Sequence, residues 1–257
     1  MLDLIRTRIN QGSQYIKDVR AAEVKIPFRG LPEIAGKACG KGCRKCEGIC
    51  PSGAIGLKQE EGMQRVSIDM GKCVFCGDCE QGCYEGIISF TNFHKISTDR
   101  IEHLVVDEAT TAKSYEEKAI ASREEIKKLF GRSLKLREIS AAGCNGCEME
   151  LNACSNVNFD MQRFGIEFVA SPRHADGIVI TGPISQNMAF AVQDTFKAVP
   201  EPKIIILVGS CAISGGVFAG SQALDRSFLE GRKIDLYVPG CPVHPLTFIN
   251  GVLSLIS

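Results

Sequence analysis

CEGICPSGAIGL (residues 46–57) and CEQGCYEGIISF (residues 79–90) are two copies of one short pattern, a cysteine run followed by an apolar stretch. Both copies lie in residues 31–93, which hold eight of the 13 cysteines of this 257-residue chain. A unit this small has little apolar core and needs stabilisation by bound metal. The repeat therefore predicts a compact domain over residues 31–93 with two related metal sites.

The spacing of the second run, C-x₂-C-x₂-C-x₃-C, is that of bacterial ferredoxins, in which the fourth cysteine binds the other cluster. The first run has one extra residue after Cys39, and Tyr84 stands where proline usually follows the second run. Structural zinc is the alternative, since C-x₂-C pairs also bind zinc. The crossing rule predicts one [4Fe–4S] cluster on Cys73, Cys76, Cys79 and Cys50, and another on Cys39, Cys43, Cys46 and Cys83.

In residues 134–257, short β-branched runs alternate with helical segments, which is typical of a parallel sheet covered by helices. We therefore expect an α/β fold, a flavodoxin-like parallel sheet domain preceded by a small bacterial-type ferredoxin domain of the α+β class. The pattern predicts strands at 134–139, 167–170, 177–181, 203–208 and 235–238, and helices at 147–156, 185–198 and 244–255.

Four further cysteines follow predicted strands: Cys144, Cys147, Cys211 and Cys241. Ligand crevices in open α/β sheets lie at the carboxyl ends of the strands, so these thiols are expected to meet there. Spacing alone is weak evidence, because a C-x₂-C pair also suits zinc or a redox-active dithiol. Glycines near each cysteine would let the backbone approach a cluster closely.

Four motifs in this half resemble the small subunit of [NiFe] hydrogenases, in the membrane-associated, energy-converting branch that includes formate hydrogenlyase and is related to respiratory complex I. The first half resembles the ferredoxin-like subunit of the same complexes, so the chain looks like a fusion of the two. The motifs are GCNGCEMEL (143–151), VITGPISQNM (179–188), VGSCAISGGVFAGS (208–221) and VPGCPVHP (238–245).

The resemblance implies that Cys144, Cys147, Cys211 and Cys241 hold a third [4Fe–4S] cluster, proximal to a nickel–iron site in a separate large subunit. It implies an oxidoreductase subunit that is not catalytic alone and relays electrons for H⁺/H₂ interconversion. The expected partners are the large subunit, other subunits including membrane subunits, and an electron-donor protein such as ferredoxin or a formate or CO dehydrogenase module.

Two alternatives stay open. One is a subunit of a nickel-free, complex I-like quinone or sulfur reductase; the separation of Cys144 from Cys147 argues against the quinone version, whose counterpart typically has adjacent cysteines. The other is a free polyferredoxin-like carrier, although a carrier needs no α/β scaffold. The electron donor, the direction of turnover and any ion pumping do not follow from the sequence.

Two segments complete the predicted organisation. Residues 1–30 form an N-terminal docking arm with helically spaced Leu2, Ile5 and Ile9, for which a membrane-surface helix is the alternative. Residues 94–133 form a linker with one surface helix over 114–130.

Individual side chains near the third cysteine group have competing interpretations. Cys154 is interpreted as a buried structural thiol. Glu148 and Glu150 are either capping or partner-facing carboxylates, or a proton relay. His244 either tunes a cluster or lies at a helix N-terminus.

Composition limits the class of protein and its location. Net charge is zero, so nucleic-acid binding has no electrostatic support. The first 20 residues lack the apolar core of an export signal, and no apolar run is long enough to span a bilayer. We expect a cytoplasmic protein, peripheral on the cytoplasmic face of the membrane through its partners.

Overall fold

Runs of isoleucine, leucine and valine form a five-stranded parallel sheet in the second half of the chain. The computed structural model describes residues 2–37, 39–40, 42–60, 63–118, 120, 124–131 and 133–256. The strand order is β10-β9-β8-β6-β7, and neighbouring strands run parallel. The strands are β6 (Leu134–Ser140), β7 (Ile166–Phe168), β8 (Gly177–Thr181), β9 (Ile204–Val208) and β10 (Leu236–Val238).

Helices cover both faces of this sheet, which confirms the predicted α/β fold. Successive residues of β9 alternate between two hydrophobic clusters: Ile205 lies with Val192 of α7, and Ile206 lies with Phe248 of α9. A strand buried on both faces needs apolar side chains at every position. The helices are α5 (Glu124–Phe130), α6 (Gly146–Ala153), α7 (Gln186–Ala198), α8 (Ser210–Ser214) and α9 (Pro245–Ile256), with 3₁₀ helices η2 (Met161–Phe164), η3 (Pro172–His174), η4 (Gly216–Phe218) and η5 (Ser227–Leu229). Elements β6 to α9 are called the α/β unit.

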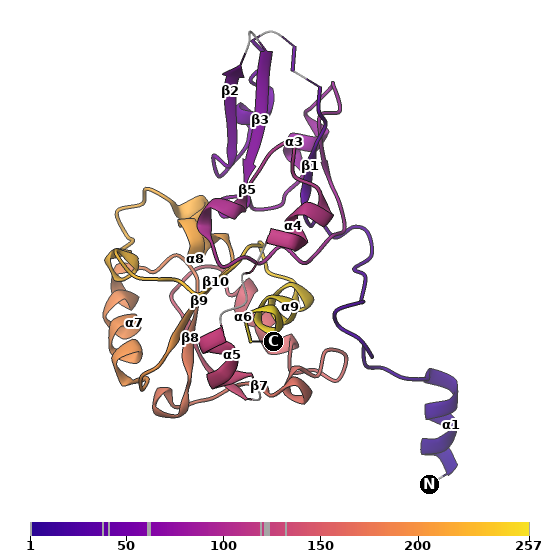
Figure 1. Ribbon diagram of the computed structural model, residues 1–257, viewed down its shortest axis with the longest axis vertical. Coiled ribbons are helices and arrows are strands. Elements are labelled where there is room, and N and C mark those ends of the chain that lie inside the picture. The colour runs from indigo at the N-terminus through magenta and orange to yellow at the C-terminus, as the bar shows by residue number, and fades with distance from the viewer. Residues whose placement is uncertain are drawn as a thin grey trace.

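The first half forms a smaller unit of antiparallel strands, called the ferredoxin-like unit, which lies against the α/β unit (Figure 1). Strand β1 pairs with β4, and β3 pairs with both β2 and β5. Two short helices between the strands carry cysteines. The elements are β1 (Pro32–Ile34), α2 (Lys45–Ile49), β2 (Ile55–Glu60), β3 (Met63–Asp69), α3 (Asp78–Gln81), β4 (Ile88–Phe90), η1 (Ile101–Leu104) and β5 (Val105–Val106).

The linker contains two helices where the sequence predicted one. The single-helix prediction is wrong, because α4 (Ala112–Lys118) and α5 are separated by Ile120, which is not helical. Residues 119 and 121–123 of the predicted helix lie outside the described residues. Each helix buries its apolar side against a different part of the core. Tyr115 of α4 belongs to one hydrophobic cluster, and Ile126 of α5 to the other.

The N-terminal residues separate into an exposed helix and a packed extended segment. Helix α1 (Leu2–Gln11) has no buried residue and projects from the body (Figure 1). The following segment lies on the α/β unit: Val19 is 1% exposed, and its carbonyl accepts a hydrogen bond from Asn250 of α9.

The two units are joined by a short backbone bridge and a continuous core. Thr98 and Tyr237 of β10 exchange two backbone hydrogen bonds, at 3.0 and 2.8 Å. The neighbouring Ser97 donates to the Thr247 carbonyl of α9, and a Cβ on Gly251 would lie 2.5 Å from Ser97 Oγ. Glycine at this position therefore permits the close approach. One hydrophobic cluster contains buried residues of both units.

Candidate cluster-binding site

The first group of thiols belongs to the ferredoxin-like unit and is called the outer set. Cys46 lies on α2 and Cys83 follows α3, so the packing of these two helices brings the two runs together. Burial raises the pKa of the Cys46 thiol, and the nearby Cys39 and Cys83 raise it further. The outer set, which lines a cavity of about 120 Å³, is Cys39, Cys43, Cys46 and Cys83.

The second group, called the inner set, takes one thiol from the first run and three from the second. Burial raises the pKa of Cys73 to about 12, and the charges of Cys79, Cys50 and Cys76 act in the same direction. Backbone amides point at two of the sulfurs: Phe75 N–H donates to Cys73 Sγ, and Ala54 N–H donates to Cys50 Sγ, both at 3.3 Å. The inner set is Cys50, Cys73, Cys76 and Cys79.

The third group, called the dispersed set, assembles at the carboxyl edge of the parallel sheet, following β6, β9 and β10. Burial raises the pKa of Cys147 to about 12, with contributions from Cys241 and Cys211. Cys144 and Cys241 are exposed. The crossover of parallel strands thus brings together thiols that lie far apart in the sequence. The dispersed set is Cys144, Cys147, Cys211 and Cys241.

Glycines leave room beside the thiols of the dispersed set. A Cβ on Gly209 (φ +87°) would lie 2.6 Å from Cys147 Sγ, and one on Gly216 (φ +55°) would lie 3.1 Å from Cys211 Sγ. Within the described ranges, no group of three or more His, Cys, Asp or Glu side chains is arranged to hold a single metal ion. A cubane differs from one ion because each thiolate binds its own iron atom. Four thiols against a glycine backbone fit such a group.

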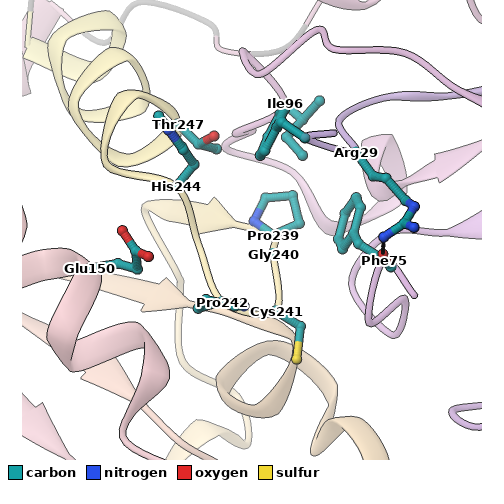
Figure 2. Close-up of a pocket in the computed structure, with 11 residues that line it drawn as sticks. Arg29, Phe75, Ile96, Glu150, Pro239, Gly240, Cys241, Pro242, His244 and Thr247 are labelled. Carbon is teal, nitrogen blue, oxygen red and sulfur yellow. Dashed lines mark hydrogen bonds between the residues drawn. The ribbon is translucent and has the colours of Figure 1, made fainter. Parts of the chain in front are cut away.

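The three sets follow one another in space. Helix α2 carries Cys46 of the outer set and ends at Cys50 of the inner set. Cys76 of the inner set contributes to the raised pKa of Cys241, after burial and Cys144. Between the two units lies a cavity of about 210 Å³, lined by Phe75 on one side and Cys241 on the other (Figure 2). The order is therefore outer, inner, dispersed.

A buried hydroxyl ties the inner and dispersed sets together. Ser210 is 1% exposed and directly precedes Cys211. Its Oγ donates to the carbonyl oxygen of Cys73 at 2.5 Å, and the carbonyl of Gly240, next to Cys241, lies 3.3 Å away. The contact joins loops that carry cysteines of both units.

Two carboxylates lie beneath the dispersed set. Glu148 is 8% exposed, and its Oε1 accepts hydrogen bonds from Ser140 Oγ at 2.6 Å and Thr181 Oγ1 at 2.8 Å. Its carboxylate therefore turns into the protein. Burial raises the pKa of Glu138 to about 7, and the charge of Glu148 adds to the effect. Glu138 Oε1 is buried, with no hydrogen-bond partner among the described residues.

Replacing Glu138 with glutamine is expected to make thermal stability less dependent on pH. The folded-state pKa of about 7 lies above the ordinary value of 4.5, so the folded protein keeps a proton that the unfolded chain releases. The resulting stabilisation is full below pH 4.5 and is lost as the pH rises through about 7. The gain in melting temperature of Glu138→Gln over the native protein should therefore be larger near pH 8 than near pH 5.

The matched control for that measurement is Glu167→Gln on β7, which removes a carboxylate from an exposed ion pair with Lys135. The difference in melting temperature between Glu167→Gln and the native protein should change little over the same range of pH. If the melting temperature of Glu138→Gln differs from that of the native protein by the same amount at both pH values, Glu138 does not titrate between them.

The remaining side chains singled out from the sequence lie near the same cavity. Cys154 is fully buried, and its Sγ lies 3.4 Å from the Glu150 carbonyl, which agrees with a structural thiol. Glu150 and His244 both line the 210 Å³ cavity (Figure 2). His244 Nδ1 accepts a hydrogen bond from Leu246 N–H at the start of α9. The imidazole thus has a role at a helix N-terminus.

Ser210, Glu138 and Arg226 were not predicted from the sequence; the guanidinium of Arg226 donates to the carbonyl of Cys211. Ser210 and Cys73 are 137 residues apart, and no local pattern marks such a contact. The only available signal was that Ser210 lies inside a cysteine motif.

Within the part of the chain that the structure describes, no helix has the length and apolar character needed to cross a membrane.

Comparison with protein families matches residues 144–255 to the NADH ubiquinone oxidoreductase, 20 Kd subunit, and residues 38–87 to the 4Fe-4S dicluster domain. The second match spans the outer and inner sets, and the first spans the dispersed set.

Curated relatives fall into hydrogenase and quinone oxidoreductase groups. The chain is 36% identical over 137 residues to the probable membrane-bound hydrogenase subunit mbhJ of Pyrococcus furiosus, covering 53% of this chain and 80% of that protein. It is 36% identical to formate hydrogenlyase subunit 7 of Escherichia coli, covering 52% of this chain and 53% of that protein. It is 44% identical over 116 residues to an NADH-quinone oxidoreductase subunit of Heliobacterium modesticaldum, covering 45% of this chain and 66% of that protein.

Among solved structures, the comparison finds a chain of the membrane-bound sulfane sulfur reductase (MBS), an archaeal respiratory membrane complex. The TM-score is 0.43 with 27% identity, and the match covers 50% of this chain and 71% of that chain.

Proposed function

Because the chain belongs to the NADH ubiquinone oxidoreductase 20 Kd subunit family, we propose that it is the small, electron-transferring subunit of a multisubunit [NiFe] hydrogenase. At the coarser level, it is an electron-transfer subunit of complex I-related hydrogenases and reductases, with a 4Fe-4S domain at its N-terminal side. The finer proposal is that it serves H⁺/H₂ interconversion at a nickel–iron site in a partner large subunit.

The observation that carries this proposal is the meeting of the four dispersed thiols at the carboxyl edge of the sheet, beside the inner set. Cys144 and Cys147 reach that edge separately because Asn145 adopts a left-handed conformation (φ 63°) and Gly146 begins α6. The similarity to the hydrogenase subunit mbhJ, over 80% of its length, supports the same function.

The proposed cofactors are three [4Fe–4S] clusters, one on each set of cysteines, which when bound would supply one-electron transfer steps. The raised thiol pKa values match this role, since iron must replace the protons that burial retains. Amides of Phe75 and Ala54 donate to sulfurs of the inner set and would spread its negative charge. Ser210 would hold the inner and dispersed sets at a fixed separation.

The order of the sets suggests which partner meets which end of the chain. An electron-donor protein, such as ferredoxin or a formate or CO dehydrogenase module, would deliver electrons at the outer set. Cys144 and Cys241 are exposed, and so are three large apolar side chains on elements that follow dispersed thiols in the sequence: Met149 (66%) on α6, and Val217 (53%) and Phe218 (41%) on η4. These side chains are proposed to contact the large subunit, since exposed apolar surface is typical of protein interfaces.

The N-terminal arm is proposed to contact further subunits. None of the residues of α1 is buried, and Leu2, Ile5 and Ile9 lie on one face of the helix. Membrane subunits among these partners would hold the chain peripherally on the cytoplasmic face of a membrane.

A nickel-free, complex I-like reductase is the second candidate. The observation that favours it is the 44% identity to the NADH-quinone oxidoreductase subunit of Heliobacterium modesticaldum, over 66% of that relative. In that case the dispersed set would exchange electrons with a quinone or sulfur site in the partner in place of nickel–iron.

The nickel content of the native complex distinguishes these candidates. The complex would be isolated through an affinity tag fused to this chain. The tag itself must contain no histidine, because a histidine tag binds nickel. About one nickel per copy of the chain, with co-purifying partner subunits, is expected for a [NiFe] hydrogenase. A strain in which the same tag is fused to an unrelated protein gives the background value.

Iron and sulfide without nickel would overturn the hydrogenase proposal and favour the nickel-free reductase. A tagged chain that carries its clusters and brings no partner would instead favour a free electron carrier.

A further inference from the structure

Arg226 occupies an unusual position beside the dispersed set. Its guanidinium donates four hydrogen bonds, all to backbone carbonyls, at distances from 2.8 to 3.1 Å. Three of the acceptors lie on α8, the short helix that carries Cys211, and the fourth is Pro183, in the loop after β8. One side chain thus ties two separate loops together.

The two loops both belong to the site. The α8 carbonyls that Arg226 binds include that of Cys211 itself, at 3.1 Å. Pro183 packs beside Gly143, the residue before Cys144, since a Cβ on Gly143 would lie 3.4 Å from Pro183 Cδ. Arg226 therefore braces the backbone next to two of the four dispersed thiols, and α8 lies on the side of the α/β unit that faces the ferredoxin-like unit (Figure 1).

The positive charge of Arg226 has no carboxylate partner among the described residues. The neighbouring Asp225 turns away and accepts hydrogen bonds from the backbone N–H and the hydroxyl of Ser227. Burial opposes the charge of the guanidinium and lowers the pKa of Arg226, and the ionised form of Cys211 favours that charge. Among the described residues, this half-buried cation is thus compensated by the carbonyl dipoles of α8 and Pro183 and by Cys211.

We propose that Arg226 is a positioning residue that keeps a positive charge beside the dispersed set and thereby favours the reduced state of the cluster bound there. This inference rests on the proposed function, because it requires a [4Fe–4S] cluster on the dispersed set. Addition of one electron, taken from the neighbouring inner cluster or from a chemical reductant, makes the cluster with its four thiolates one unit more negative. A cation in a region of low dielectric stabilises that state more than the oxidised one.

The test is a redox titration of the native complex, followed by the EPR signal of the reduced proximal cluster. Arg226→Gln removes the charge and keeps hydrogen-bond donors. At a fixed potential, its ratio of reduced to oxidised cluster should fall about tenfold, which is about 59 mV for a one-electron couple. Arg226→Lys keeps the charge with fewer donors, and its ratio should stay within about threefold of the native value.

The control is Arg163→Gln, which removes a cation that lies over the rings of Tyr15 and Phe164 and does not contact the dispersed set. The potential of the proximal cluster should be native in this variant. Iron content and the EPR signal at full reduction show whether each variant has kept its clusters, and neither readout depends on turnover.

Equal potentials in Arg226→Gln and the native complex would overturn the proposal, as would an equal fall in the glutamine and lysine variants, which would indicate bracing without a charge effect. If the glutamine variant loses the cluster, the lysine variant decides the outcome. A near-native potential in Arg226→Lys supports the proposed effect of the positive charge. Loss of the cluster, or a tenfold change in its ratio of reduced to oxidised cluster, overturns the proposal. Absence of a third cluster signal in the native complex would refute the proposed function itself, before any Arg226 variant is compared.

Discussion

Under the proposed function, replacing Cys241 with alanine is expected to abolish the EPR signal of one [4Fe–4S] cluster and to lower H₂–proton turnover by the native complex more than about 100-fold. Changes to groups that merely support a metal ligand already cost about 10- to 100-fold, and Cys241 is a proposed ligand. It is also the dispersed thiol on which Cys76 of the inner set acts. Its loss would therefore interrupt electron transfer between the two units.

Cys154→Ala is the matched control, since it removes a thiol that is fully buried in the same unit and belongs to none of the three sets. All cluster signals and roughly native turnover are expected. The measurements are EPR of the reduced complex and H₂ production with a chemical donor. A Cys241→Ala complex with every cluster signal intact would exclude Cys241 as a ligand, and a missing cluster in Cys154→Ala would contradict the structural assignment of that thiol.

Replacing Gly209 with alanine is expected to prevent the dispersed set from holding its cluster. The new Cβ would lie 2.6 Å from Cys147 Sγ, at a backbone φ of +87°. Strain of this backbone type costs about 1–3 kcal/mol for a residue with a side chain. The contact adds a second cost, because either the thiol or the loop between β9 and α8 has to move.

Gly220→Ala separates these two costs. Gly220 has nearly the same φ, +83°, but a Cβ there would meet nothing within 4 Å. Both variants place a side chain at a positive φ and should lose backbone stability, while only Gly209→Ala should lose iron and the proximal cluster signal. Iron analysis and thermal unfolding of both variants check this. Equal iron loss in the two would mean that backbone strain alone, and not crowding of Cys147, disturbs the site.

The α/β unit could be predicted from sequence because its buried strands have continuous apolar runs. The strand predicted at 177–181 is β8 as observed, and the one at 203–208 differs from β9 by one residue. The short runs end at glycine or polar residues, which limits where a strand can stop. The strand predicted at 235–238 also differs from β10 by one residue, and only the one at 167–170 is displaced at both ends, since β7 has just three residues, Ile166–Phe168.

The strands of the ferredoxin-like unit could not be predicted in the same way. Strands β2 and β3 pair over six positions, yet they contain Lys58, Gln59 and Arg65 among their residues. Apolar residues are few in these strands, as expected for a small unit that bound metal stabilises in place of a large core. In the linker, continuous helical periodicity hid the break at Ile120, since the two helices pack on different clusters.

The grouping of the cysteines followed from spacing within the ferredoxin-like unit, where the crossing of Cys50 and Cys83 is a regular feature of the repeat. For the dispersed set, the position of each cysteine after a predicted strand indicated that the thiols meet, and the family resemblance assigned them to one cluster. The hydrogen bonds of Arg226 reach Pro183, 43 residues earlier. Such contacts depend on how the loops pack after the sheet has formed, and short-range patterns do not contain that information.

The two units share one hydrophobic cluster, so each unit buries part of its apolar surface against the other. Where two separate proteins must meet, their local concentrations limit how often they are paired; covalent connection replaces that encounter with a fixed, high effective concentration. Each copy of the α/β unit is synthesised with its own ferredoxin-like unit, so the stoichiometry cannot deviate from one to one. Under the proposed function, regulation of electron supply would then have to act on the external donor, and not on the abundance of an intermediate carrier.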